Sequence, residues 1–172
     1  EGRYVLAEVG PDDTTLTTPC APVTDHGQVA GLASDMLETM YAAPGRGLAA
    51  PQVGHPIRLF VMDVAWKTGA PEPFICINPE IVERGEGAVT GPEGCLSIPG
   101  YLGEVERAEA IRVRAQDRNG KKIKLRLGGW TARIFQHEID HLNGVLFIDK
   151  LTDPKHLWTE EEFRDLQEAA AA

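Results

Sequence analysis

Residues 136–141 read QHEIDH and lie within a segment, 131–142, whose apolar residues recur at helical spacing. Two glycines precede the segment, and Asn143-Gly144 follows it, which is typical of the end of a helix. Residues four apart share one face of a helix, so His137 and His141 can bind the same metal ion. A second face of this helix is apolar and predicts packing on a core: Phe135, Ile139 and Leu142.

Glu138 stands beside the histidine pair, where it can reach a water molecule bound to the metal. Zinc or ferrous iron suits two imidazoles, and a bound cation lowers the pKa of its water toward neutrality. Glu138 could then accept that proton and pass it to a leaving amine. The motif alone leaves open a plainer alternative, a helix with two surface histidines and a solvated carboxylate.

Two imidazoles need a third ligand from elsewhere in the chain, and Cys95 is the candidate. It lies in the segment 92–99, PEGCLSIP, where glycine and prolines predict a shaped loop rather than the interior of a strand. A thiolate and two imidazoles leave a fourth tetrahedral position for water, which is the arrangement of a catalytic site. Taken alone, a free cysteine is more often a buried structural residue, and we interpret Cys20 and Cys76 in that way.

Outward from this helix the sequence mixes strands with few helices. An apolar stripe predicts a helix over 29–41, with Met36 and Met40 in the core. Thr159 and Glu162 predict a capping box at the start of a last helix. Asn119-Gly120 predicts a hairpin turn. Residues that favour β-structure predict strands at 57–64, 74–77, 81–82, 111–115, 123–127 and 145–148. This order indicates an α+β fold.

Composition limits the class of protein. The chain has 172 residues and neither a repeat nor a long linker, so we expect one domain, 1–172. Its 17 Lys and Arg against 26 Asp and Glu give a net charge of −9, which argues against non-specific nucleic-acid binding and against docking on an anionic membrane. No apolar run approaches the roughly 20 residues of a membrane span, and the first residues do not resemble a signal peptide. Three distant cysteines favour a reducing compartment.

A third segment, 45–52, reads GRGLAAPQ. Small residues in such a run let the backbone approach a ligand closely. The segment lacks the Gly-Lys-Ser/Thr ending of a phosphate loop, so nucleotide binding is not expected. The amide of Gln52 could donate a hydrogen bond to a developing oxyanion, although taken alone this residue is an ordinary loop glutamine.

Together, segments 45–52, 93–97 and 136–141 closely resemble the three signature motifs of peptide deformylase, in the same order. The resemblance extends from about Leu16 to Lys150. It implies an α+β fold in which antiparallel β-sheets pack around a central helix that carries the histidine pair. It also implies a hydrolase that removes the N-formyl group from the N-terminal formyl-methionine of nascent polypeptides at the ribosome exit and releases formate.

The resemblance further implies one divalent metal ion per chain, held by Cys95, His137 and His141. Fe²⁺ is the expected native metal, with Zn²⁺, Ni²⁺ or Co²⁺ as substitutes. Because the thiolate and ferrous iron are both oxidisable, we expect activity to be lost in air. The bacterial cytoplasm is the expected location, or an organelle matrix if a leader has been removed.

Other positions of the motifs take catalytic and substrate roles by the same resemblance. Glu138 would serve as general base and then acid, and Gln52 with the backbone N–H of Leu96 would hold the oxyanion. Trp130 and Ile134 are candidates for the wall of the methionine pocket, although core packing explains them equally well. The expected substrate-binding residues are Gly45, Arg46, Gly47, Glu93, Gly94, Trp130 and Ile134.

Two departures from the family pattern stand out. Arg46 occupies a position that is usually small or apolar, at the substrate rim; it could contact a peptide carbonyl or an acidic end of a substrate, or simply be exposed. The C-terminal segment, 160–168, is rich in Glu and Asp, which puts in doubt the docking on ribosomes through a basic C-terminal helix.

Two alternatives remain at this stage. A metalloprotease can use the same His-Glu-x-x-His helix with a third ligand downstream, where His156 and several glutamates are available. A non-enzymatic member that stores metal or binds peptides is the other, although Gln52, Glu138 and the residues around Leu96 argue against it.

Overall fold

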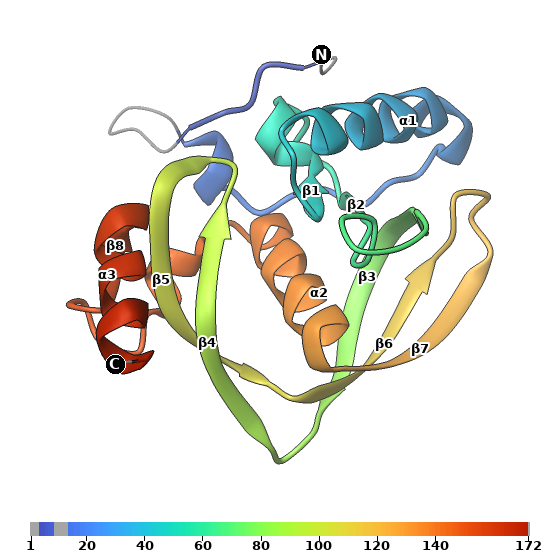
Figure 1. Cartoon of the computed structure of the whole chain (residues 1–172). Coiled ribbons are helices and arrows are strands. Elements are labelled where there is room, and N and C mark those ends of the chain that lie inside the picture. The colour runs from blue at the N-terminus through green and yellow to red at the C-terminus, as the bar shows by residue number, and fades with distance from the viewer. Residues whose placement is uncertain (1–3, 9–13, 172) are drawn as a thin grey trace.

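A computed structural model describes residues 4–8 and 14–171 of the chain. Helix α2 (Gly129–Leu142) runs through the middle, between two antiparallel β-sheets (Figure 1). The first sheet has the strand order β1-β2-β3-β6-β7, with bounds Gly47–Ala49, Leu59–Met62, Phe74–Arg84, Ala110–Gln116 and Lys122–Gly128. The second sheet has the order β4-β5-β8, with bounds Ala88–Cys95, Ile98–Ala108 and Leu157–Thr159. The predicted α+β class, with antiparallel sheets around a central helix, is confirmed.

Two further α-helices and three short 3₁₀ helices complete the described fold. Helix α1 (His26–Ala42) begins three residues before the predicted start, because Asp25 caps it by accepting a hydrogen bond from the backbone of Gln28. Helix α3 (Glu160–Ala171) begins with the predicted capping box, in which Thr159 and Glu162 bond each other's backbone N–H. The 3₁₀ helices are η1 (Thr15–Thr17), η2 (Ala50–Val53) and η3 (Phe147–Lys150).

The five-stranded sheet carries a helix on each face, and strand β2 shows how the sequence arranges this. Leu59 and Val61 pack in the same cluster as Met36 and Met40 of α1, whereas Phe60 packs in the cluster of α2. Successive side chains of a strand point to opposite faces, so an unbroken apolar strand is what a doubly covered sheet requires.

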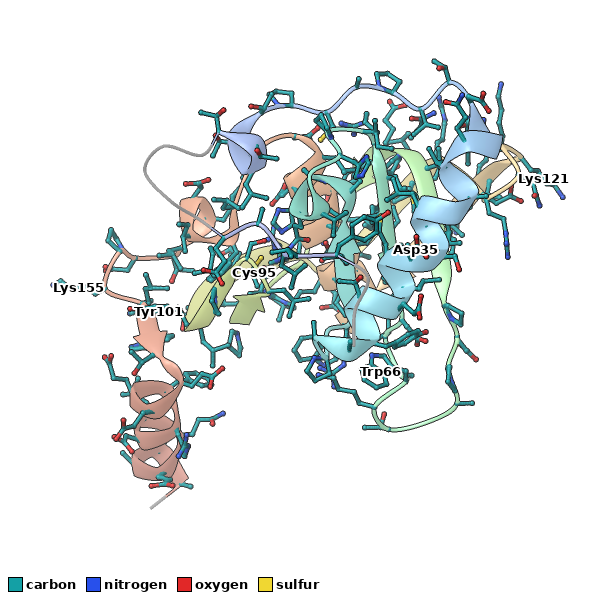
Figure 2. All side chains as sticks on the ribbon, turned by 90° about the horizontal axis from the view of Figure 1, so that it is seen from above. Asp35, Trp66, Cys95, Tyr101, Lys121 and Lys155 are labelled. Carbon is teal, nitrogen blue, oxygen red and sulfur yellow. The ribbon has the colours of Figure 1, made fainter. Side chains whose placement is uncertain are left out.

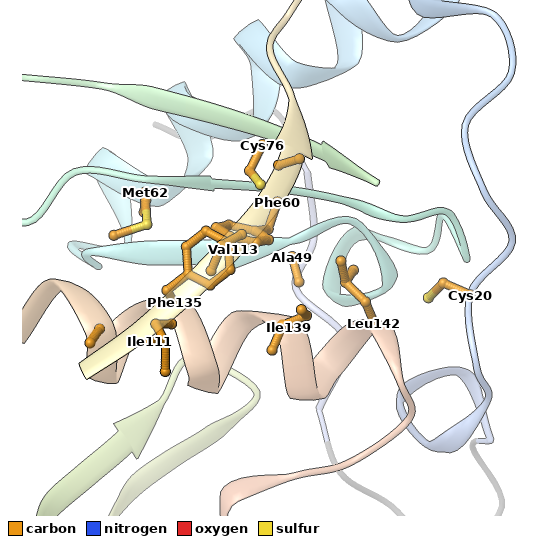
Figure 3. Packing of buried hydrophobic residues seen from close by; sticks show 12 residues of the cluster. Cys20, Ala49, Phe60, Met62, Cys76, Ile111, Val113, Phe135, Ile139 and Leu142 are labelled. Atoms are coloured by element: carbon orange, nitrogen blue, oxygen red, sulfur yellow. The ribbon is translucent and has the colours of Figure 1, made fainter. Parts of the chain in front are cut away.

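On the α2 side, Phe60 meets Phe135 edge to face, with the ring centroids 4.9 Å apart (Figure 3). Ile139 and Leu142 continue this apolar face of α2, and Cys76 is buried beside them as expected. Burying each of these large side chains contributes about 1.5–3 kcal/mol. The core therefore holds α2 firmly by one face and leaves its other face for the second sheet.

The predicted hairpin joins β6 and β7. Gly120 has a φ of +84°, and the side chain of Asp117 accepts hydrogen bonds from the backbone of Asn119 and Lys121. A loop with glycine in the left-handed region is a common hairpin connection, because glycine adopts that conformation without strain. In this turn the positive φ falls on Gly120 alone, not on Asn119.

Two predicted features are wrong. Residues 145–148 do not form a strand: Val145 donates a backbone hydrogen bond to Asp140 at the end of α2, and the chain then enters η3, where Asp149 caps the backbone of Leu146. A short apolar run cannot be assigned from periodicity alone.

The segment 92–99 is not a loop either. Its first part ends strand β4, its last part begins strand β5, and only Leu96-Ser97 forms a turn. Pro92 is tolerated there because β4 lies at the edge of its sheet and pairs with β5 alone. Cys95 is therefore placed by a strand end and a tight turn, which fixes its position better than a loop would.

Among the described residues, no helix is long and apolar enough to cross a membrane. All three cysteines are free. The expectation of one domain over 1–172 stays a prediction.

Candidate active site

The three predicted metal ligands meet where the end of β4 approaches α2. One donor atom from each of Cys95, His137 and His141 lies within 4.8 Å of the other two. The Sγ of Cys95 and the Nε2 of His141 are 3.4 Å apart. Ligand atoms of a tetrahedral ion with bonds of about 2.0–2.3 Å are separated by about 3.5 Å. A thiolate with two imidazoles also suits zinc or ferrous iron, so the site fits a divalent metal ion.

Glu93 orients His137 from the same strand that carries Cys95. Its Oε1 lies 2.9 Å from the Nδ1 of His137, which leaves the Nε2 of that ring available to a metal. The carboxylate of Glu93 also accepts hydrogen bonds from Arg107, at 2.8 and 2.9 Å, and from Arg133, at 2.6 Å. Arg107 in turn donates to Asp140, one residue before His141. His137 is thus held by a buried network of charges that extends to Asp140, the neighbour of His141 in the sequence.

The sequence interpretation missed both arginines of this network. Arg107 lies on β5 and Arg133 on α2, respectively 14 and 40 residues from Glu93, so no local spacing links them to it. The sequence did contain one sign of a buried charge. Arg133 interrupts the otherwise apolar stretch 132–135 of a helix that was expected to pack on the core. Burial alone would raise the pKa of Glu93, but hydrogen bonds from Arg107 and His137 hold it well below its usual range.

Glu138 is buried directly beside the three predicted metal ligands. Its Oε2 lies 4.0 Å from the Nε2 of His137, and its Oε1 has no hydrogen-bond partner among the described residues. Burial raises the pKa of Glu138 to about 7. Gly47 covers this carboxylate so closely that a Cβ at position 47 would lie 2.5 Å from Oε2. Glycine is therefore required at position 47 by the packing of Glu138.

Gln52 is fixed on the other side of Cys95 by the short helix η2. Its Oε1 accepts a hydrogen bond from the backbone of Ala49, at 2.9 Å, and its Nε2 donates to Ser97, at 3.0 Å. The same Nε2 lies 3.6 Å from the Sγ of Cys95. These contacts turn the NH₂ group of a buried amide toward the turn that contains Leu96. The amide is therefore held ready to donate at the metal site.

A cavity of about 760 Å³ opens over these groups. Every residue predicted for substrate binding lines it, as do Gln52, Cys95 and Glu138. Trp130 is 64% exposed, which excludes ordinary core packing for it, whereas Ile134 both lines the cavity and packs against the core. The volume lies within the range of small-ligand sites, about 300–1,000 Å³. Figure 2 places Cys95 inside the molecule and Tyr101, which also lines the cavity, nearer its edge.

The downstream ligand of a metalloprotease is not found at this site. His156 is bonded to Glu104 and Thr152 and stacks on Trp158, and 41% of its side chain is exposed. Among residues 4–8 and 14–171, the group of side chains that could hold a metal ion consists of the two histidines and Cys95. The metalloprotease alternative is therefore not favoured.

Comparisons with known proteins point to one family. The family model described as Polypeptide deformylase matches residues 8–157. A peptide deformylase of Alkalilimnicola ehrlichii is 52% identical over 151 residues, which are 88% of this chain and 83% of that protein. One from Mesorhizobium japonicum is 50% identical over 135 residues, 78% of this chain and 77% of that protein.

Two solved structures are similar throughout. The peptide deformylase of Synechococcus elongatus, in complex with actinonin, has a TM-score of 0.84 and 39% identity, and the match covers 91% of this chain and 82% of that one. The peptide deformylase of Thermus thermophilus has a TM-score of 0.81 and 46% identity, and the match covers 96% of this chain and 93% of that one. The chain therefore belongs to the polypeptide deformylase family and is an enzyme of that class.

Proposed function

We propose that this enzyme hydrolyses the formamide at the start of formyl-methionyl peptides, with one divalent ion held by Cys95, His137 and His141. The observation that carries the proposal is the grouping of these three donor atoms beside a buried carboxylate in a cavity of peptide size. When bound, such an ion acts as a Lewis acid that activates water and polarises a carbonyl. We propose Fe²⁺ as the native metal, with Zn²⁺, Ni²⁺ or Co²⁺ as substitutes.

Glu138 is the proposed proton carrier. Water adds its oxygen to the formyl carbon, the C–N bond breaks, and the proton that the water gives up passes through the Glu138 carboxylate to the amine nitrogen of the methionine. The immediate products are formic acid and a free amine. At neutral pH the acid gives its proton to the amine, so formate and a protonated N-terminus leave, and atoms and charges balance. A carboxyl group with a pKa of about 7 can both accept and return a proton near neutral pH.

Gln52 and the backbone N–H of Leu96 are the proposed donors to the oxygen of the formyl group as negative charge develops on it. The amide of Gln52 is suited to this because its oxygen is already occupied by the backbone of Ala49. A donor that is fixed before the reaction loses no free energy in reorienting, and removal of one such donor costs about 10²–10³ in kcat.

Glu93 takes a different role from the one first expected. Its carboxylate is buried and shared among Arg107, Arg133 and His137, so we assign it to orienting His137 rather than to binding the peptide. The peptide would instead meet the backbone at Gly45, Gly47 and Gly94, and Trp130 and Ile134 would wall the methionine side chain.

We place the reaction on nascent polypeptides at the ribosome exit in the bacterial cytoplasm. Free cysteines, one of them a proposed metal ligand, suit a reducing compartment. Helix α3 begins with three consecutive glutamates and buries none of its residues, so docking through a basic C-terminal helix is not part of the proposal.

The decisive test is formate release from an N-formyl-methionyl tripeptide by protein purified without air, with its metal counted in parallel. We expect rapid release by the parent enzyme and a fall of about 10²–10⁴ in kcat for Glu138→Gln, with unchanged metal content. Cys95→Ala should lose metal and activity together. A Glu138→Gln enzyme as fast as the parent would refute the mechanism, and a fully metallated parent that releases no formate would refute the reaction.

A further inference from the structure

Two cations, Arg46 and Lys67, lie at the rim of the substrate cavity. Both line the cavity, and both side chains are exposed. In the described part of the chain, neither forms a salt bridge with an acidic residue. The protein has a net charge of −9, so two cations beside each other at its substrate cavity depart locally from the charge of the whole chain.

The backbone at Arg46 is fixed by a loop that folds over it. The carbonyl of Arg46 accepts a hydrogen bond from the backbone of Asp63, at 2.9 Å, and the carbonyl of Gly45 accepts one from the indole of Trp66, at 2.8 Å. Arg46 also directly precedes Gly47, which covers the catalytic carboxylate. The position of this arginine relative to the reacting centre is therefore set by a rigid frame.

Lys67 is held by the same loop. Its Nζ lies 5.8 Å from the ring centroid of Trp66, and that ring packs edge-on against Tyr41 of α1, with the centroids 5.0 Å apart. Figure 2 shows Trp66 close to the end of α1. Partial burial and the positive charge of Arg46 lower the pKa of Lys67, so the two cations are near enough to repel each other. An anion placed between them would relieve this repulsion.

We propose that Arg46 and Lys67 form a subsite for an acidic side chain, Asp or Glu, at the second or third residue of the formyl-methionyl peptide. The inference rests on the proposed function and names a preference of the same site. An extended peptide advances about 3.3 Å per residue, so the residues just after the methionine pass within reach of a long side chain that starts beside Gly47. Glu8 and Glu160 line the cavity from other segments, and Arg133, which also lines it, is already paired with Glu93. Arg46 and Lys67 are therefore the cations available to an acidic side chain in the described lining.

The test uses the metallated enzyme and C-terminally amidated peptides, formyl-Met-Xaa-Ala-amide and formyl-Met-Ala-Xaa-amide, with Asp, Asn or Lys as Xaa. Asn has the shape of Asp without its charge. We expect kcat/KM to follow the order Asp, Asn, Lys at one or both positions, through KM, by about two- to fivefold per cation. The preference should shrink between about 0.05 M and about 0.5 M salt, because screening weakens exposed ion pairs.

Two single variants, Arg46→Gln and Lys67→Gln, and their double variant identify the source of the preference. Each single variant should lower the Asp/Asn ratio, and the double variant should bring it close to one. Arg112→Gln is the matched control, because that arginine lies on β6, is exposed, and pairs with Glu83 away from the cavity. It should keep the parental ratio.

The outcomes separate the two proposals. An Asp/Asn ratio of one in the parent, or a preference that survives in the double variant, overturns the subsite. The same peptides made with a free C-terminal carboxylate serve as a further arm. A gain confined to them also overturns the subsite, because the cations would then bind a chain end and not a side chain. Failure to release formate from every peptide, the neutral ones included, counts instead against the proposed function.

Discussion

Helices α1 and α2 lie on opposite faces of the five-stranded sheet, but the side chains that they bury differ in polarity. The side chains that α1 buries are Ala33, Met36, Thr39 and Met40, with a single hydroxyl group among them. Helix α2 buries four apolar side chains and also four polar or charged ones: Arg133, Gln136, Glu138 and His141. The buried side chains of α1 are mostly apolar, and its polar contacts, such as that of Tyr41 with Asp63, lie nearer the surface, whereas α2 must find partners for polar groups that it buries.

Those partners come from the three-stranded sheet. Glu93 on β4 and Arg107 on β5 reach the polar side of α2, and Gln136 bonds the backbone of Ala108 at the end of β5. Removal of one member of a buried charge network leaves the others unpaired at a high cost in free energy. The comparison therefore predicts that substitutions at the polar side of α2 harm both the fold and the site, whereas those in α1 harm the fold alone.

The largest effect is expected for Arg107→Met, which removes the cation between Glu93 and Asp140 and leaves two carboxylates buried without it. We expect the free energy of unfolding to fall by about 3–5 kcal/mol, and metal content to fall as well, because Glu93 no longer holds His137 in place. Urea denaturation and metal analysis measure the two effects. Arg112→Met, which breaks an exposed pair, should cost about 0–1 kcal/mol, and equal losses in the two variants would contradict the comparison.

Met36→Ala tests the other side of the comparison. Met36 is fully buried, so its truncation should cost about 2–5 kcal/mol in the free energy of unfolding. Metal content and kcat/KM of the folded enzyme should change little, since Met36 packs on the α1 side of the sheet and is not among the residues that line the cavity. Met36→Leu, which nearly conserves the volume, is the control and should cost less than about 1.5 kcal/mol. Loss of activity without loss of stability would show that α1 does more than pack.

The same substitution, glycine to alanine, can be made beside the site and on α1 to compare the two regions further. In Gly47→Ala the new methyl group would lie 2.5 Å from the Glu138 carboxylate, which must then move, and we expect kcat to fall about 10²-fold. In Gly31→Ala, on α1, the methyl group meets nothing within 4 Å, so we expect unchanged activity and a gain of about 0.4–1 kcal/mol in stability. Formate-release kinetics and urea midpoints check both, and an active Gly47→Ala enzyme would mean that Glu138 tolerates displacement.

The smallest expected effect concerns Tyr41 of α1, which donates a hydrogen bond to the buried carboxylate of Asp63. Burial and the hydrogen bond to Asp63 raise the pKa of Tyr41 to about 12. The folded pKa exceeds the unfolded value of about 10, so this stabilisation is complete below pH 10 and is lost as the pH rises toward 12. Urea midpoints between pH 9 and 12 should therefore fall more steeply for the parent than for Tyr41→Phe. Parallel curves would remove Tyr41 as the cause.

Local patterns in the sequence predicted the parts of the molecule that local physics determines. The periodicity of α2 placed Phe135 on the core and His137 on another face, and the capping box at Thr159 began the last helix as expected. The grouping of Cys95 with the histidine pair was also predicted, but it needed the joint match of three segments, because a lone cysteine carries little information.

The failures have one physical cause in common. Strand β4 was mistaken for a loop at 92–99 because pairing with β5, which is a tertiary interaction, overrides the local signal of its prolines and glycines. Arg107 and Arg133 were missed because an ion pair formed across a fold leaves no spacing in the sequence. The role of Glu93 followed from those arginines, so it could not be assigned before they were placed.

The proposed metal site has a consequence for the stability of the folded chain. Cys95 ends β4 and His137 lies on α2, so an ion bound to both ties together two points that are 42 residues apart in the sequence. The bound ion would act as a reversible crosslink that closes a long loop. It would stabilise the folded state by about 2.7 kcal/mol when the concentration of free metal is 100 times its dissociation constant. A chelator should therefore lower the Tm of the unaltered protein, and oxidation of the Cys95 thiolate should cut the same link from its sulfur end.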